Sequence, residues 1–181
     1  SMIITISGTP GSGKSSVARL IAKKLNLKHY SIGDFMRQMA TEREVTLAEL
    51  GELAKIDPAI DEALEGKQIK LGKIEDNFVI DGRLSYHFVP NSIKIFIDAD
   101  IKERARRIVQ DSSNRSTEDA TDIDETIASI AKRKNVERQR YMKYYHLDPY
   151  ELDHYDLVID ATAPSAEEVA NKIVDFVNTK S

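Results

Sequence analysis

The chain has 181 residues, of which 41% are hydrophobic and 31% charged, and its formal net charge is −4. These values are typical of a soluble globular protein, and the length suffices for one domain with a substantial core. The absence of a basic excess disfavours a nucleic-acid-binding surface. The absence of cysteine excludes disulfides, thiolate catalysis and cysteine-ligated zinc.

The N-terminal apolar run extends only from Met2 to Ile6, before Gly8 and Pro10 interrupt it. It is too short for a signal peptide or a membrane span. We expect a cytoplasmic, monomeric protein whose partner is a small molecule and neither a membrane nor a nucleic acid.

Residues 2–7 are apolar and β-branched, as in a central parallel strand covered on both faces. After a glycine-rich segment, apolar residues recur from Lys14 onward at spacings of three and four, which predicts a helix. Further strands are expected at residues 28–31, 78–81, 93–98 and 156–160, and helices begin near Asp100 and Ser165. Strands that alternate with helices predict a doubly wound, five-stranded parallel sheet.

Two segments interrupt this alternation. Residues 33–73 are predicted to be helical, because Thr46 with Glu49 forms a capping-box pattern and Asp57-Pro58 supplies an N-cap and a first-turn proline. Residues 112–146 begin acidic and become basic, with six bases and one acid in KRKNVERQRYMK (132–143). We expect this second segment to be a polar, mobile helical excursion.

The segment GTPGSGKS (8–15) matches the pattern G-x-x-x-x-G-K-[ST] and lies between an expected strand and an expected helix. Glycines allow backbone N–H groups to face an anion, and the helix N-terminus adds partial positive charge. The pattern predicts that Lys14 reaches the β- and γ-phosphates of a nucleoside triphosphate and that Ser15 ligates magnesium. The expected nucleotide-binding residues are Gly8, Thr9, Pro10, Gly11, Ser12, Gly13, Lys14, Ser15 and Ser16.

Asp81 closes the expected strand 78–81, where a magnesium-binding carboxylate of this kind of site is found. Its other possible role is to cap the turn DGR. Asp98 and Asp160 also end expected strands and are weaker candidates for the same role.

Phosphoryl transfer needs positive charge around the transferring group. Arg83 follows a strand end, where open α/β sheets bind ligands, and Arg37 lies in the helix after residue 31. The basic run 132–143 has three interpretations: a solvated helix face, a nucleic-acid patch, or a lid whose arginines reach the phosphates. The acidic net charge favours the lid and places nucleic acid last.

The ordered segments SIGDFMR, DPAID, DGRL, RARRI and YDLVI, together with the glycine-rich loop, resemble those of the nucleoside monophosphate kinases. The similarity is greatest to the short archaeal-type cytidylate kinases and covers nearly the whole chain. It implies a single P-loop NTPase domain, 1–181, that contains helical insertions. The core would be 1–30, 76–111 and 146–181, with a monophosphate-binding insertion at 31–75 and a lid at 112–145.

The resemblance also implies roles for individual residues. Ser31, Asp34, Arg37 and Arg83 would hold the acceptor nucleotide, and Arg104 or Arg107 would lie near the donor base. Lys14 and the lid residues Arg133, Arg138 and Arg140 would be catalytic. The implied reaction transfers a phosphoryl group from ATP, with Mg²⁺, to CMP or dCMP, because DGRL replaces the DGFPR of adenylate kinases.

Other functions remain open from the residues alone. An adenylate kinase is one, because SIGDFMR is close to the adenylate kinase segment. A kinase that phosphorylates a hydroxyl group, as in shikimate or a nucleoside, would use Asp34 as its base. A non-catalytic nucleotide switch is another, although the chain contains no N-K-x-D segment for guanine. The four histidines form no evident constellation and are predicted to be structural or surface residues.

Overall fold

A five-stranded parallel sheet forms the centre of the computed structural model, which describes residues 1–111 and 120–180. The strand order is β2-β3-β1-β4-β5. The strands are β1 (Ile3–Gly8), β2 (Lys28–Ser31), β3 (Phe78–Asp81), β4 (Ile93–Asp98) and β5 (Leu157–Asp160). This sheet confirms the predicted fold class. Because all five strands are parallel, their carboxyl ends lie at one edge of the sheet, and the loop that follows the central strand β1 lies in the middle of this edge.

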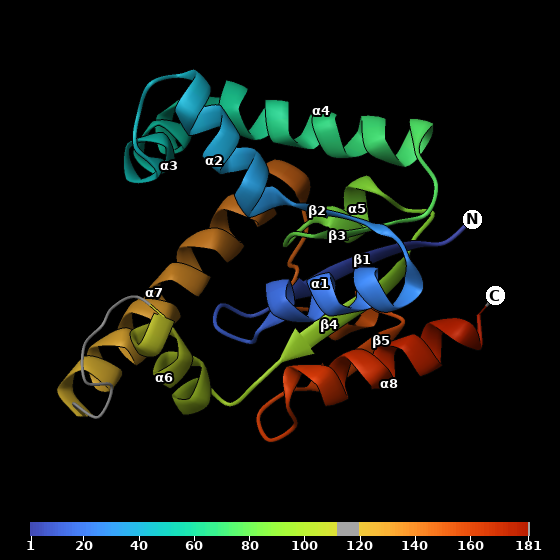
Figure 1. Ribbon diagram of the computed structural model, residues 1–181. Coiled ribbons are helices and arrows are strands. Elements are labelled where there is room, and N and C mark those ends of the chain that lie inside the picture. Colours follow the sequence, from blue (N-terminus) through green and yellow to red (C-terminus); the bar gives the residue numbers. More distant parts are fainter. Residues whose placement is uncertain (112–119, 181) are drawn as a thin grey trace.

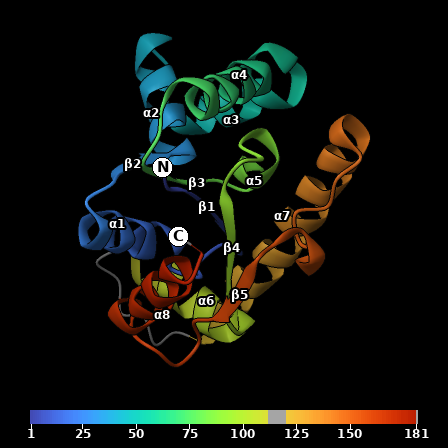
Figure 2. The ribbon, with the colours of Figure 1, turned by 90° about the vertical axis from the view of Figure 1, so that its right-hand side faces the viewer.

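Helices cover both faces of the sheet (Figures 1 and 2). On one face, α1 (Lys14–Leu25) packs against α8 (Ala166–Asn178). The short helix α5 (Ser85–Phe88) and the long helix α7 (Ala120–Tyr145) lie on the other side of the sheet in Figure 2. Within the described ranges, no helix is long and apolar enough to cross a membrane.

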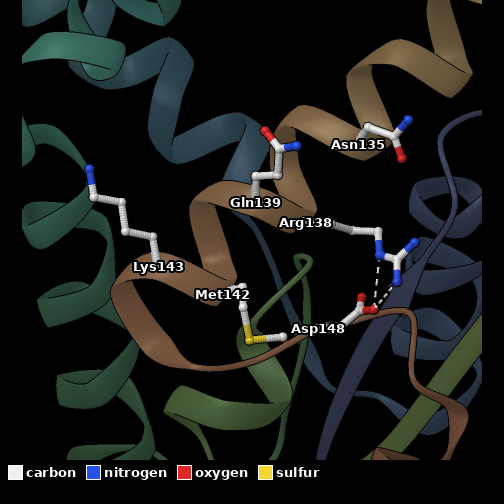
Figure 3. Close-up of a pocket in the computed structure, with 6 residues that line it drawn as sticks. All are labelled: Asn135, Arg138, Gln139, Met142, Lys143 and Asp148. Carbon is white, nitrogen blue, oxygen red and sulfur yellow. Dashed lines mark hydrogen bonds and ion pairs between the residues drawn. The ribbon is translucent and has the colours of Figure 1, made fainter.

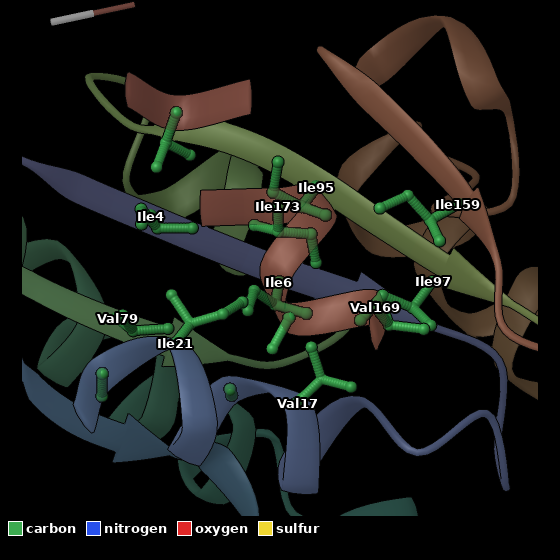
Figure 4. Packing of buried hydrophobic residues seen from close by; sticks show 14 of the residues in the cluster. Ile4, Ile6, Val17, Ile21, Val79, Ile95, Ile97, Ile159, Val169 and Ile173 are labelled. Carbon is green, nitrogen blue, oxygen red and sulfur yellow. The ribbon is translucent and has the colours of Figure 1, made fainter. Parts of the chain in front are cut away.

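Alternate residues of β1 enter two different cores. Ile4 and Ile6 are fully buried in the cluster beneath α1 and α8, whereas Ile3 belongs to a cluster on the opposite face. Figure 4 shows Ile21 of α1 and Ile173 of α8 beside this strand in the first cluster. Burial on both faces explains why β1 contains no charged residue and why its two small polar residues, Thr5 and Ser7, are buried as well.

Three helices lie between β2 and β3, at the top of Figure 1: α2 (Ile32–Glu42), α3 (Leu47–Ile56) and α4 (Pro58–Ile74). Their N-termini are capped where the sequence predicts. Thr46 Oγ1 accepts a hydrogen bond from the Glu49 N–H (3.1 Å), and Asp57 Oδ1 accepts one from the Ala59 N–H (3.0 Å). These caps satisfy amides that a helix start leaves unpaired.

The basic run 132–143 lies entirely within α7, a helix of 26 residues. The predicted excursion is therefore helical from residue 120, while its residues 112–119 are outside the described part of the chain. The early turns of α7 pack along α6 (Ile101–Asp111). Near the C-terminal end of α7, Tyr141 and Tyr145 pack with Tyr86 and Phe88 of α5. This end of α7 is therefore held against α5.

The turn after β3 brings three segments together at Gly82. A Cβ atom on this residue would lie 2.4 Å from Ile32 Cγ1 and 2.5 Å from Ser85 Oγ. Ser85 cannot move freely, because its hydroxyl donates a 2.7 Å hydrogen bond to Gln68 Oε1. Glycine is therefore required for the close approach of the β3 turn, α2 and the start of α5.

Gly82→Ala is expected to lower the free energy of unfolding by about 1–3 kcal/mol, because the new methyl group forces neighbours from a packed site. Urea denaturation of both proteins measures the difference. The control is Gly66→Ala in α4, where a Cβ meets nothing within 4 Å. That variant is expected to be no less stable than the parent, since alanine favours helix. Unchanged stability of Gly82→Ala would contradict the packing argument.

Candidate active site

Two glycines of the glycine-rich segment between β1 and α1 leave no room for a side chain. A Cβ on Gly8 would lie 2.5 Å from the Ile97 carbonyl oxygen, and one on Gly11 would lie 2.6 Å from the Arg104 carbonyl oxygen. Gly11 and Gly13 have φ values of 79° and 89°, in the left-handed region that glycine tolerates. The glycines thus shape a cradle of bare backbone.

Backbone donors at the start of α1 are available to an anion. The amides of Gly11, Gly13 and Lys14 bond to no acceptor among residues 1–111 and 120–180. They precede or begin a helix of 12 residues, whose N-terminal partial charge is positive. Together with the cradle, these donors fit the phosphates of a nucleotide. The predicted residues Thr9, Pro10, Ser12, Ser15 and Ser16 belong to the same turn and first helical turn.

Asp81, at the carboxyl end of β3, is the centre of a buried polar cluster. Its Oδ1 lies 3.2 Å from Ser15 Oγ and 3.4 Å from Lys14 Nζ. Its Oδ2 lies 2.6 Å from His29 Nε2. The side chain of Asp81 is only 2% exposed. A hydroxyl and a carboxylate are suitable magnesium ligands, and the structure brings the two predicted metal ligands within 3.2 Å of each other.

The cluster changes the proton affinities of its members. Burial lowers the pKa of Lys14, and the charge of Asp81 only partly opposes this effect. Burial also acts to raise the pKa of Asp81, but the hydrogen bond from His29 and the charge of Lys14 prevail, so that pKa is lowered. Asp81 therefore remains an ionised carboxylate.

The two weaker candidates for metal binding have other partners. Asp98 Oδ1 accepts hydrogen bonds from Thr9 Oγ1 and from the Ala99 N–H, both at 2.8 Å. Asp160 Oδ1 accepts hydrogen bonds from the hydroxyl and the amide of Thr162 in the turn after β5. The structure therefore favours Asp81 over both.

Two arginines of α6 donate hydrogen bonds to backbone carbonyl oxygens of the glycine-rich loop. Arg104 is buried and donates to the carbonyl oxygens of Ala99 (2.9 Å) and Pro10 (3.4 Å). Arg107 donates to the carbonyl oxygens of Ser12 (3.1 Å) and Ala161 (2.7 Å). Both predicted residues thus lie at the glycine-rich loop. Their contact with the base of a bound nucleotide stays a prediction.

Arg83 extends from the β3 turn to α7. Its Nε lies 2.7 Å from Glu137 Oε2, and the two side chains are 18% and 12% exposed. Arg133 Nε lies 3.6 Å from Glu137 Oε1, and Tyr150 donates a 3.1 Å hydrogen bond to Glu137 Oε2. Burial acts to lower the pKa of Arg83, but the charge of Glu137 together with Tyr150 and Tyr141 outweighs it, and the pKa is raised. One carboxylate is therefore held among two arginines and a tyrosine hydroxyl.

The other two arginines of the basic run point elsewhere. Arg138 pairs with the buried Asp148 (2.8 Å) in a groove of about 560 Å³ along a different face of α7 (Figure 3). Arg140 Nε lies 3.9 Å from Asp61 Oδ2 and therefore joins α7 to α4. The structure brings Arg133 to Arg83 and does not bring Arg138 there.

The remaining predicted acceptor residues lie at the start of α2. Ser31 caps this helix, where its Oγ accepts a hydrogen bond from the Asp34 N–H (3.4 Å). The Asp34 carboxylate is ion-paired with Arg37, and their side chains are 62% and 59% exposed. These residues are open to a ligand from solvent, and their contact with one stays a prediction.

Sequence reasoning missed His29, Glu137 and Tyr150 in the site. His29 is predicted from the sequence to be a structural or surface residue, and the structure places it against the carboxylate at the centre of the cluster. Glu137 carried one available signal, since it is the single acid within the basic run 132–143. Tyr150 carried none, because only the fold brings its hydroxyl to α7.

Residues 3–163 match the model of the cytidylate kinase-like family. The chain belongs to this family. Proteins with the name cytidylate kinase from Methanocella arvoryzae and Archaeoglobus fulgidus are 39% and 37% identical to this family member. Those alignments cover 98% and 99% of the chain and 97% and 96% of the relatives. The resemblance inferred from the sequence motifs is thus confirmed.

Solved structures show the same fold for this cytidylate kinase-like chain. A shikimate kinase from Acinetobacter baumannii superposes with a TM-score of 0.67 at 13% identity, covering 99% of this chain and 94% of the other. A protein from Eubacterium ventriosum superposes with a TM-score of 0.72 at 19% identity, covering 98% and 99%. At these identities the likeness concerns the fold alone, which is that of a P-loop kinase.

Proposed function

We propose that the protein transfers the γ-phosphoryl group of ATP to CMP or dCMP. Membership in the cytidylate kinase-like family makes the chain a nucleotide kinase. The observation that supports the site most strongly is the convergence of Lys14 and Ser15 on Asp81 at the carboxyl edge of the sheet. The cytidine base is proposed from the family and from the DGRL segment.

The donor phosphates would lie on the glycine-rich loop. The amides of Gly11, Gly13 and Lys14 donate to them, and the Lys14 ammonium neutralises charge on the β- and γ-phosphates. Mg²⁺, when bound with the nucleotide, would be held by Ser15 and Asp81 and would neutralise charge on the phosphate oxygens. Binding of ATP draws Lys14 from Asp81 toward the phosphates.

The acceptor needs no general base, because a monophosphate is already an anionic nucleophile. Arg83 is suited to bind it, since Arg83 and Arg133 already hold the Glu137 carboxylate between them. Bidentate arginine is the preferred protein ligand for such oxyanions. Ser31, Asp34 and Arg37 are proposed to hold the rest of the acceptor.

These positions suggest a role for each segment of the chain. Residues 31–75 are proposed as the monophosphate-binding part and 112–145 as the lid, within a single domain whose core is 1–30, 76–111 and 146–181. Arg133 and Arg140 are proposed to reach the phosphates when the lid moves, and Arg138 would have to leave Asp148 to do so. The monomeric state and the cytoplasmic location remain predictions.

The rate of ADP formation from Mg·ATP, measured with CMP, dCMP, UMP, AMP, GMP and shikimate as acceptors, tests the proposal. We expect rapid turnover with CMP and dCMP and little with the other compounds. Preference for AMP would support the proposed kinase activity but overturn the assignment of cytidine as the acceptor base. Turnover with shikimate alone would indicate a hydroxyl kinase with Asp34 as its base, and no stimulation by any acceptor would indicate a nucleotide switch.

A further inference from the structure

His29 lies in β2, the edge strand beside β3, and contacts the buried carboxylate of the active site. The parallel register pairs His29 with Val79, two residues before Asp81. Because side chains alternate along a strand, His29 and Asp81 stand on the same face of the sheet as the N-terminus of α1. The imidazole is 17% exposed, and its Nε2 lies 2.6 Å from Asp81 Oδ2.

The two oxygens of Asp81 have separate partners. Oδ1 faces Ser15 and Lys14 of the nucleotide-binding loop, whereas Oδ2 faces His29. An ionised carboxylate has only acceptor atoms, so the proton between Asp81 and His29 belongs to Nε2, which donates it. This bond fixes the rotation of the carboxylate about its Cβ–Cγ bond.

We propose that His29 is a positioning residue, which orients Asp81 so that Oδ1 faces the magnesium ion of the bound nucleotide. The inference rests on the proposed magnesium site at Ser15 and Asp81. Partners of this kind behind a ligating side chain set its orientation and basicity. The lowered pKa of Asp81, to which the His29 hydrogen bond contributes, agrees with a carboxylate kept ready for a cation.

Loss of the imidazole has two consequences for the site. Oδ2 becomes a buried acceptor without a donor, which is unfavourable at a side chain that is 2% exposed. The carboxylate is then free to rotate, so Oδ1 is no longer held toward Ser15 Oγ, which lies 3.2 Å from it. The metal therefore loses a preorganised ligand.

Two variants at this position separate positioning from packing. His29→Leu retains a side chain of similar size but replaces the imidazole with an apolar group, so the hydrogen-bond donor is lost. His29→Gln keeps an N–H donor at a similar reach. If the leucine variant does not fold, His29→Asn replaces it, because the shorter amide does not reach Oδ2. His87→Leu is the control, since His87 is an exposed histidine of α5.

The decisive measurement is the affinity of Mn²⁺ for the ADP complex, determined by electron paramagnetic resonance, alongside calorimetric ADP binding in EDTA. We expect His29→Leu to weaken Mn²⁺ binding by about 10–100-fold and to leave metal-free ADP binding unchanged. His29→Gln should recover most of the loss, and His87→Leu should match the parent.

Unchanged Mn²⁺ affinity in His29→Leu would overturn the proposal. So would an equal loss of ADP affinity in EDTA, or a glutamine variant as poor as the leucine variant, because both indicate a structural role. These readouts do not depend on the acceptor. If the parent protein binds Mn·ADP but phosphorylates no monophosphate, the proposed function fails and the role of His29 is still decided.

Discussion

Lys14→Met is expected to reduce kcat by about 10²–10³-fold, the effect of removing one preorganised donor from a charge-stabilising site. Lys14 is the first residue of the helix after the cradle, and burial has already removed most of the water around its ammonium group. In the proposed transition state its charge would face phosphate oxygens that carry growing negative charge. Methionine keeps the length of the side chain and removes the charge. Steady-state kinetics with Mg·ATP and CMP measure the loss.

Lys23→Met, at an exposed position of the same helix, is the matched control and should retain full activity. Thermal unfolding of both variants separates loss of catalysis from loss of fold. If Lys14→Met kept kcat within a few-fold of the parent while remaining folded, the glycine-rich loop would not be the donor site.

Arg83→Gln is expected to lower kcat/KM for CMP by about 30-fold or more, equivalent to about 2 kcal/mol or more for a truncated buried charge partner. The guanidinium is buried beside the strand end and already holds an anionic group, the Glu137 carboxylate, at 2.7 Å. The affinity for ATP should change little, because Arg83 is not part of the donor loop. The comparison of KM for CMP with the binding constant for ATP tests this separation.

Arg83→Gln also leaves Glu137 without its closest cation, which destabilises the protein for reasons unrelated to the acceptor. The double variant Arg83→Gln with Glu137→Gln removes that unpaired charge. It should recover stability and keep the low kcat/KM of the single variant for CMP. Arg106→Gln, which removes the ion pair with Glu103 and the hydrogen bond to Gln110 on α6, is the control. Recovery of activity in the double variant would show that the role of Arg83 is to pair with Glu137 of α7 and not to bind the acceptor.

Much of the fold could be predicted because its signals are local. The apolar run of β1 and the glycine-rich loop define the first strand, turn and helix, and the predicted strands 28–31, 78–81 and 93–98 coincide with β2, β3 and β4. The prediction for β1 was shifted by one residue, since Gly8 still pairs with Ile97 before the chain turns. Strand alternation and helix caps act within a few residues, so they are visible in the sequence.

The remaining features depend on contacts between distant segments. Helix α5 has four residues and exists because Ser85, Tyr86 and Phe88 are buried against α4 and α7. The orientation of α7 decides which of its arginines face Arg83, and that orientation is set by Tyr141 and Tyr145 packing on α5. A single sequence does not fix this rotation. It therefore could not distinguish Arg133 from Arg138.

The contact of His29 with Asp81 was missed for the same reason. The pair is separated by 52 residues and arises from the register of β2 against β3. A lone histidine before a helix start carries no signal of this pairing. Once the strand order is known, alternation along the two strands is enough to place both side chains on one face.

Direct transfer of the phosphoryl group is the central claim, and isotope transfer tests it most directly. ATP labelled with ³²P at the γ-position is incubated with Mg²⁺, CMP and the protein, and the products are separated by chromatography. We predict that the label appears in CDP, at a rate that Lys14→Met and Arg83→Gln both reduce. Label found only in inorganic phosphate, with CMP unchanged, would contradict the account.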